Sequence, residues 1–311
     1  MVILLLVALV CGAGVALQSR INGQLGGELG DGSLAAVISF GSGLIITVIA
    51  LLASRGGRQG LGTVVREVRA RRFPWLFVFG GLGGGLFVLS QGITVGVIGV
   101  ALFTVAAVAG QTISGLVIDA RGIGTVAPKR VTVWRLVGSV VALVAVIVSV
   151  VPEVQANSPL WMLVMPFVVG LLLGFQQAFN GQVKTLANSA VTATFINFVG
   201  GTALLVVAAA INLAIVGWPK VFPTNPVLYL GGLIGVLFIA GFAVVIPVIG
   251  VLLQSLAAVS GQLVMSLILA IVAPTNAATL TVTTVVGTVL TLGGVAIASV
   301  PSRRRVASLV E

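Results

Sequence analysis

A glutamine and an asparagine recur with the same spacing at two places in the chain. The two segments read LQSRINGQ at residues 17–24 and FQQAFNGQ at residues 175–182. Gln18 therefore matches Gln176, and Asn22 matches Asn180. Residues four apart share one face of a helix, and amides both donate and accept hydrogen bonds. Such a face can contact a polar solute, or it can bond neighbouring helices and cap helix ends.

Two further matched positions extend this pattern. ISFGSG at 38–43 and INFVGG at 196–201 match Ser39 with Asn197, and VIGVALFTVAAVAGQ at 97–111 and VIGVLLQSLAAVSGQ at 248–262 match Gln111 with Gln262. We expect Gln111 and Gln262 to lie on opposite sides of a membrane midplane, where their amides can hold the polar part of a solute. Gln91 would extend the lining, and Gln254 shares the segment of Gln262. Packing between helices is the alternative role.

Arg20 stands inside the first motif, where the second has Ala178. Near the outer mouth of a transport path it could attract an anionic solute. The favoured alternative is that its long side chain reaches the lipid headgroups.

Several kinds of chemistry have no residues to support them. The chain has no histidine and one cysteine, Cys11, so the commonest metal ligands are missing. It also has no nucleotide-binding loop and no nucleophile–base pair, so we predict neither an enzyme nor a cofactor. Four of the acidic residues are expected in loops or at span ends: Glu28, Asp31, Asp119 and Glu153. Without an acid deep in the membrane, exchange of protons for organic cations is disfavoured.

Composition identifies the elements that must hold these residues. The chain is 59% hydrophobic and only 7% charged, unlike a soluble protein. Apolar runs long enough to cross a bilayer lie near residues 2–21, 32–53, 75–94, 97–118, 132–151, 160–180, 189–216, 228–245, 249–272 and 280–298. Runs of this length are helices rather than barrel strands. We therefore predict an all-α membrane protein with ten transmembrane helices.

The net charge of +10 is explained by its location. Ten spans with both termini in the cytoplasm place all but two of the basic residues, Arg20 and Lys220, on the inner side, as the positive-inside rule requires. This arrangement predicts a multi-pass protein of the cytoplasmic membrane. It gives no reason to expect a nucleic-acid partner.

The duplication divides the chain into a first five-helix repeat at 1–151, an outer linker at 152–159 and a second repeat at 160–311 with a basic tail. Because five is odd, the second repeat enters the membrane from the opposite face. Inverted repeats of this kind place a substrate site near the midplane, where the halves meet. GGLGGGLF at 80–87 and GGLIGVLF at 231–238 suit close helix packing, and Pro166 predicts a kink in the sixth span.

With these motifs in place, the chain resembles the drug/metabolite transporter superfamily, and most closely its YdcZ-type branch. The residues that carry the resemblance are Gln18-x-x-x-Asn22-Gly23-Gln24, Ile38-Ser39-Phe40 and Val97-Ile98-Gly99-Val100. The resemblance implies a drug/metabolite transporter-like fold in a fused ten-helix form, and secondary transport. It departs from the small multidrug resistance proteins, because the first span has Gln18 and no membrane glutamate.

These observations predict a permease that moves a small polar metabolite by alternating access between inverted halves. Its partners would be that substrate and the lipid bilayer, and it would act as a monomer or homodimer. The alternative is a membrane scaffold or assembly factor that transports nothing, in which the matched polar residues pack without a shared cavity.

Overall fold

The protein was examined as a computed structural model, which describes residues 1–123, 128, 131–150, 160–219, 221–272 and 282–300. Within these ranges, the structure does not describe the side chains of residues 91–93, 95–102, 104–105, 149–150, 160, 270 and 284. The described residues form helices joined by short turns, and none of them is in a strand. The all-helical class predicted from the sequence is confirmed.

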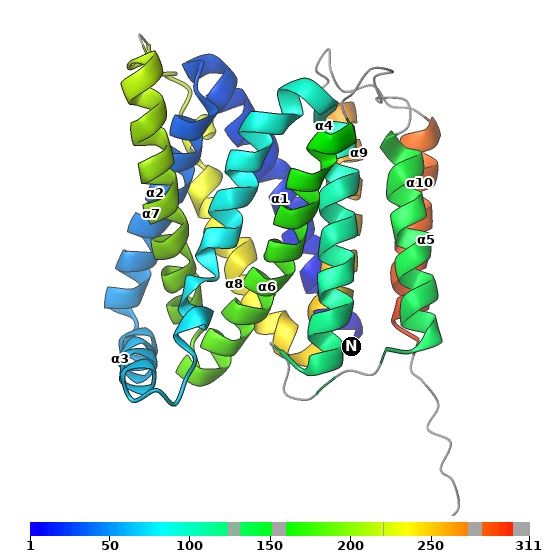
Figure 1. The fold of residues 1–311 in the computed structure, drawn as a ribbon, viewed down its shortest axis with the longest axis horizontal. Helices are drawn as coiled ribbons and strands as arrows, with labels where there is room; N and C mark the ends of the chain where they lie inside the picture. The colour runs from blue at the N-terminus through cyan, green and yellow to red at the C-terminus, as the bar shows by residue number, and fades with distance from the viewer. Residues whose placement is uncertain (124–127, 129–130, 151–159, 220, 273–281, 301–311) are drawn as a thin grey trace, which may run out of the picture.

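The long helices run roughly parallel or antiparallel in one bundle, and the short helix α3 lies across one end of it (Figure 1). Their bounds are α1 Val2–Leu29, α2 Gly32–Ala53, α3 Arg55–Arg69, α4 Gly81–Arg121, α5 Val133–Val150, α6 Val164–Ala187, α7 Ala190–Val216, α8 Gly231–Ile249, α9 Val251–Val272 and α10 Val282–Ala298. Among the described residues, six stretches are long and apolar enough to cross a membrane: Val2–Leu29, Gly32–Ala53, Trp161–Ala187, Ala190–Val216, Pro226–Ile249 and Val251–Leu269. Three shorter apolar helices accompany them, in 75–90, 133–148 and 285–298.

Helix α4 corrects the expectation of two separate helices at 75–94 and 97–118. It is assigned as one helix of 41 residues. In a straight helix, Gly83 and Ser114 would lie about 46 Å apart. Yet Gly83 lies against Gln176 of α6 and Ser114 lies against Gly174, only two residues away. Helix α4 therefore bends back on itself, and its two limbs flank α6, as the cyan and teal ribbon in Figure 1 shows.

The start of α2 is fixed by a local cap. Asp31 accepts hydrogen bonds from the backbone N–H groups of Ser33 and Leu34, at 2.9 and 3.1 Å. These bonds satisfy donors that the first turn of a helix leaves free. Partial burial raises the pKa of Asp31, but the hydrogen bonds to the charged form outweigh it, and the net shift of this pKa is downward. The carboxylate is thus the form that holds the cap.

Prolines do not act where the sequence suggested. Pro166 is buried in the first turn of α6, where its missing N–H would have had no helical partner, so it marks a helix start and not a kink. Pro247 lies inside α8, close to its C-terminal end. The apolar run expected at 228–245 continues to Ile249, which is why Pro247 was not anticipated within it.

The main helix contacts join segments from the two sequence repeats. Helix α1 packs on α8 and α9, α2 packs on α7 and α8, α4 packs on α6 and α7, and α5 packs on α10. The core between them includes the fully buried side chains Leu25, Ile118, Phe198, Leu205, Ile246, Leu252 and Leu256. Because the helices of each repeat pack mainly on helices of the other repeat, the two repeats share one core.

Candidate functional site

The amides of the second repeat form one buried hydrogen-bonded cluster. The side-chain oxygen of Asn197, on α7, accepts from both Gln176 and Asn180 of α6, each at 2.9 Å. Asn197 has no exposed surface. Among the described residues, two atoms of the cluster have no partner: Oε1 of Gln176 and Nδ2 of Asn197. The cluster therefore offers a free acceptor and a free donor in an interior where such groups are costly.

The first repeat has a looser version of the same cluster. Asn22 of α1 donates to Ser39 Oγ of α2 at 3.1 Å, and Gln18 donates to the carbonyl of Gly231 at 2.7 Å. Gln18 and Asn22 are half-buried, whereas Ser39 is buried. Oδ1 of Asn22 has no partner in the described part of the chain. The Gln–Asn pair of each motif thus bonds to a neighbouring helix, whereas Gln24 is exposed and donates to Glu28 of its own helix at 2.9 Å.

Glycines of each repeat provide the space for the amides of the other. A Cβ on Gly231 would lie 2.1 Å from Asn22 Oδ1, and a Cβ on Gly80 would lie 3.1 Å from Asn180 Oδ1. Gly80 and Gly231 are matched positions, as are Asn22 and Asn180. The two contacts are therefore equivalent: in one, a glycine of the second repeat faces an amide of the first, and in the other these roles are exchanged. A side chain at Gly231 would displace the amide, so the glycine motif is required by this approach.

An aromatic pair lies between the two clusters. The rings of Phe40 and Phe198, which are matched positions of the two repeats, have centroids 5.4 Å apart. Phe198 lies against Gly43 and Gly235, and Phe40 lies against their matches, Gly201 and Gly84. Each of these two rings therefore touches its own counterpart, and the glycines around them also match. Sequence analysis did not single out Phe40 or Phe198, although both follow the matched Ser39/Asn197 position.

Replacing Asn197 by leucine is expected to destabilise the protein by about 1–3 kcal/mol for each of the two buried amide donors that it strands. Replacing Ser39 by alanine should cost less than half as much, because Asn22 is half-buried and water can replace the lost bond. Denaturant titration of the purified protein, followed by helical circular dichroism, would measure both. Asn197→Ser, which copies the first repeat, is the control and should recover part of the loss. Equal losses at Ser39 and Asn197 would contradict the cluster described here.

The remaining predicted site residues are dispersed. Gln111 is half-buried on the second limb of α4, and Gln262 is half-buried on α9. In the part of the chain that the structure describes, no hydrogen bond joins these two side chains, and their role in a solute path stays a prediction. Gln91 lies in α4, but its side chain is outside the described residues. Arg20 is half-buried on α1, two residues from Gln18.

Gln254 is the clearest polar feature that sequence analysis did not rank among the site residues. It lies on α9, where every side chain from Val251 to Ser260 is buried. Gln254 has no exposed surface, and both its amide nitrogen and its amide oxygen lack a partner among the described residues. Its match in the first repeat is Phe103, which is also buried. A fully desolvated, unpaired amide where the other repeat has a phenylalanine is costly and indicates a binding function.

The surroundings of Gln254 place it between the two repeats. One turn further along α9, Ala258 lies against Gly12 of α1. A Cβ added at Gly12 would lie 2.0 Å from the Ala258 carbonyl oxygen. Ser255, the residue after Gln254, donates a hydrogen bond from its hydroxyl to Oε1 of Gln177 on α6 at 3.0 Å. The buried half of α9 therefore lies between the two helices that carry the duplicated amide motif.

Asp119 lies at a helix end, as expected, and the structure adds that this acid is buried. It is near the C-terminal end of α4 and only 1% exposed. Its carboxylate pairs with Arg135 of α5 at 2.5 Å and accepts from the backbone N–H groups of Val251 and Leu252, at 2.7 and 3.3 Å. Arg135 is itself buried. The carboxylate thus caps α9, and its charge is neutralised by Arg135. The local sequence around residue 119 could not reveal a hydrogen-bond partner 132 residues away.

The long apolar helices, their exposed aliphatic side chains and the buried amides between them define the class of this protein, a multi-pass helical membrane protein. The chain belongs to the YdcZ-type drug/metabolite transporter family, described as "Putative inner membrane exporter, YdcZ", which matches residues 3–148 and 161–297. The sequence-based resemblance to this family is confirmed. A search of curated proteins found no match.

A solved structure shares the fold. Titled only "Crystal structure of protein", it superposes with a TM-score of 0.67 over 96% of this chain and 95% of its own, at 16% identity. At this identity the likeness concerns the fold alone. The family match supports a transporter role in the inner membrane and favours it over an enzymatic one.

Proposed function

We propose that this protein is a secondary transporter that moves a small uncharged polar solute by alternating access between two inverted five-helix halves, residues 1–151 and 160–311. The observation that carries the proposal is the contact between Phe40 and Phe198. A pseudo-two-fold axis through this pair would relate the halves, as in many secondary transporters. The opposite directions of α1 and α6 in Figure 1 agree with that axis.

The matched contacts support a rocking mechanism. The approach of Gly12 to Ala258 is repeated by Gly170 and Ala107, their matches in the other direction. Two equivalent interfaces can exchange slightly different conformations at a small free-energy difference, which opens the centre to each side in turn. The Phe40–Phe198 pair would separate the two access routes.

The solute class follows from the polar groups that remain free. The buried ionisable side chains among the described residues, Asp119 and Arg135, neutralise each other. Apart from Nε of Arg135, the buried side-chain atoms without a hydrogen-bond partner among the described residues are all uncharged: amide atoms of Asn22, Gln176, Asn197 and Gln254, and the hydroxyls of Ser90 and Thr202. Uncharged donors and acceptors fit a neutral solute that carries hydroxyl or amide groups.

The test is counterflow into proteoliposomes with a panel of neutral polar solutes, preceded by a thermal-shift screen for binding. We expect saturable exchange of at least one neutral solute. Single cysteines at the matched positions Gln24 and Gln182, in a Cys11→Ser background, should be labelled by an impermeant reagent from opposite sides of the membrane. Labelling of both from the same side would contradict the inverted arrangement. A protein that binds no solute and exchanges none would favour the scaffold alternative.

A further inference from the structure

Helix α3 creates an open hollow at the end of the bundle that the transport proposal does not use. The hollow measures about 920 Å³ and is lined by Leu51, Leu52, Arg58, Leu61, Gly62, Val65, Arg66, Arg69 and Ala70. It lies between the C-terminal end of α2 and one face of α3. Residues 58, 61, 65 and 69 recur at helical spacing, so this face combines an aliphatic centre with an arginine at each end.

The opposite face of α3 is already used for packing. Gly57, Gly60 and Val64 are buried, and Thr192 of α7 donates to the Gly57 carbonyl at 2.9 Å. A Cβ on Gly60 would lie 2.7 Å from the carbonyl oxygen of Ala187. The helix is therefore fixed against α6 and α7. On the face toward the hollow, the described residues leave Val65 41% exposed.

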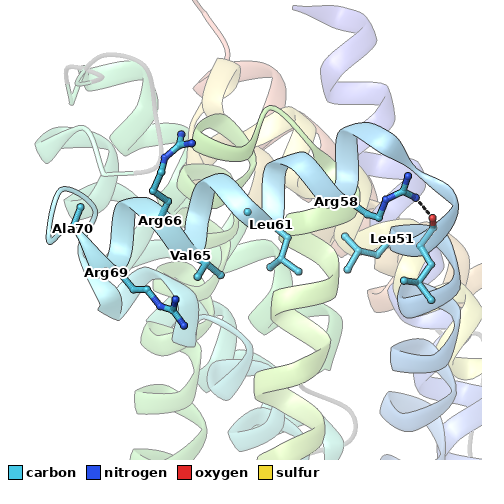
Figure 2. A pocket seen from close by; sticks show the side chains of 9 residues that line it. Leu51, Arg58, Leu61, Val65, Arg66, Arg69 and Ala70 are labelled. Atoms are coloured by element: carbon cyan, nitrogen blue, oxygen red, sulfur yellow. Dashed lines mark hydrogen bonds between the residues drawn. The ribbon is translucent and has the colours of Figure 1, made fainter.

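Figure 2 shows how the side chains around the hollow lie. Leu61, Val65 and Arg69 project from one side of α3, whereas Arg66, which also lines the hollow, is paired with Glu67 at 3.2 Å. Arg58 lies at the far end beside Leu51 and donates to the Leu52 carbonyl. A guanidinium has five N–H donors, so this bond leaves most of the Arg58 donors available.

The hollow continues the lipid-facing surface of α2. Ile45, Ile49 and Leu52 form a stripe at helical spacing, and each is more than 60% exposed. In a bilayer this stripe contacts acyl chains, and it ends where Arg58 and the α3 face begin. An aliphatic surface that ends at guanidinium groups matches an anionic phospholipid: the acyl chains fit the aliphatic surface, and the phosphate fits the guanidinium groups.

We propose that this hollow binds an anionic phospholipid, with its acyl chains along Ile45, Ile49 and Leu52 and its phosphate at Arg58 or Arg69. Guanidinium groups bond phosphate oxygens bidentately, and juxtamembrane arginines contribute strongly to binding of anionic lipid surfaces. The aliphatic centre of the hollow favours this ligand over an acidic peptide or a free anion. Bound lipid would hold α3 and the end of α2 at the membrane surface.

The test is native mass spectrometry of the full-length protein in neutral detergent, titrated with phosphatidylglycerol, with phosphatidylcholine or with inorganic phosphate. We expect roughly tenfold tighter binding of phosphatidylglycerol than of phosphatidylcholine, and a loss of most of this preference in Arg58→Gln/Arg69→Gln. The matched control, Arg55→Gln/Arg72→Gln, removes the same charge from residues outside the hollow and should keep the preference.

Three outcomes would overturn the proposal. An equal loss in both double variants would reduce the effect to net charge. Inorganic phosphate that displaces the lipid at similar concentration would identify a free-anion site. Equal retention of the two lipids by the unmodified protein would leave only nonspecific lipid contact.

Discussion

Replacing Gln254 by leucine is expected to reduce transport strongly and, at the same time, to stabilise the protein. The amide has no exposed surface and no partner for its nitrogen or its oxygen in the described part of the chain. Removing unpaired polar atoms from an interior in favour of an aliphatic group of similar size should raise the free energy of unfolding by about 1–3 kcal/mol. A solute that bonds this amide would lose both bonds. Flux should then fall at least roughly tenfold.

The matched position in the first repeat supplies the control. Phe103 is buried and apolar, so Phe103→Leu removes no hydrogen-bonding group. We expect this variant to be less stable, because it leaves a cavity, and to transport at close to the normal rate. Thermal unfolding and counterflow, measured on the same preparations, separate the two effects. Normal flux in Gln254→Leu would exclude Gln254 from the site. A loss of stability in that variant would indicate that the amide has a structural partner.

Removing the carboxylate of Asp119 should destabilise the protein more than any other single change considered above. In Asp119→Ala, Arg135 stays buried without its counter-charge, and the N–H groups of Val251 and Leu252 lose their acceptor. Breaking one partner of a buried ion pair costs about 3–5 kcal/mol, and loss of the helix cap adds to that cost. Denaturant titration in detergent measures the change.

Two variants distinguish this explanation from a general sensitivity of the fold. Glu67→Gln breaks the exposed pair with Arg66, which should cost no more than about 1 kcal/mol. The double variant Asp119→Leu/Arg135→Met removes both buried charges and should recover much of the loss. If Asp119→Ala were as mild as Glu67→Gln, the buried pair would not be holding α9.

Part of the candidate site could be predicted from the sequence alone. Duplication matched Gln18, Asn22 and Ser39 with Gln176, Asn180 and Asn197, and helical spacing placed the members of each Gln–Asn pair on one face. In the structure Gln176 and Asn180 both donate to Asn197, whereas in the first repeat only Asn22 donates to Ser39 and Gln18 donates to Gly231 of α8. Spacing could not reveal that Asn197 accepts two bonds, because a hydrogen-bond partner depends on how two helices rotate against each other.

The sequence alone determined that this is a helical membrane protein built from a duplicated segment, and it identified the family. Hydropathy and repetition suffice for that, since the bilayer imposes the same length and polarity on every span regardless of its neighbours. Only the tertiary structure decided where α4 bends, that Asp119 caps α9, that Phe40 meets Phe198 and that Gln254 is enclosed without a partner. These features join residues far apart in the chain, and their free energies depend on packing that no local pattern records.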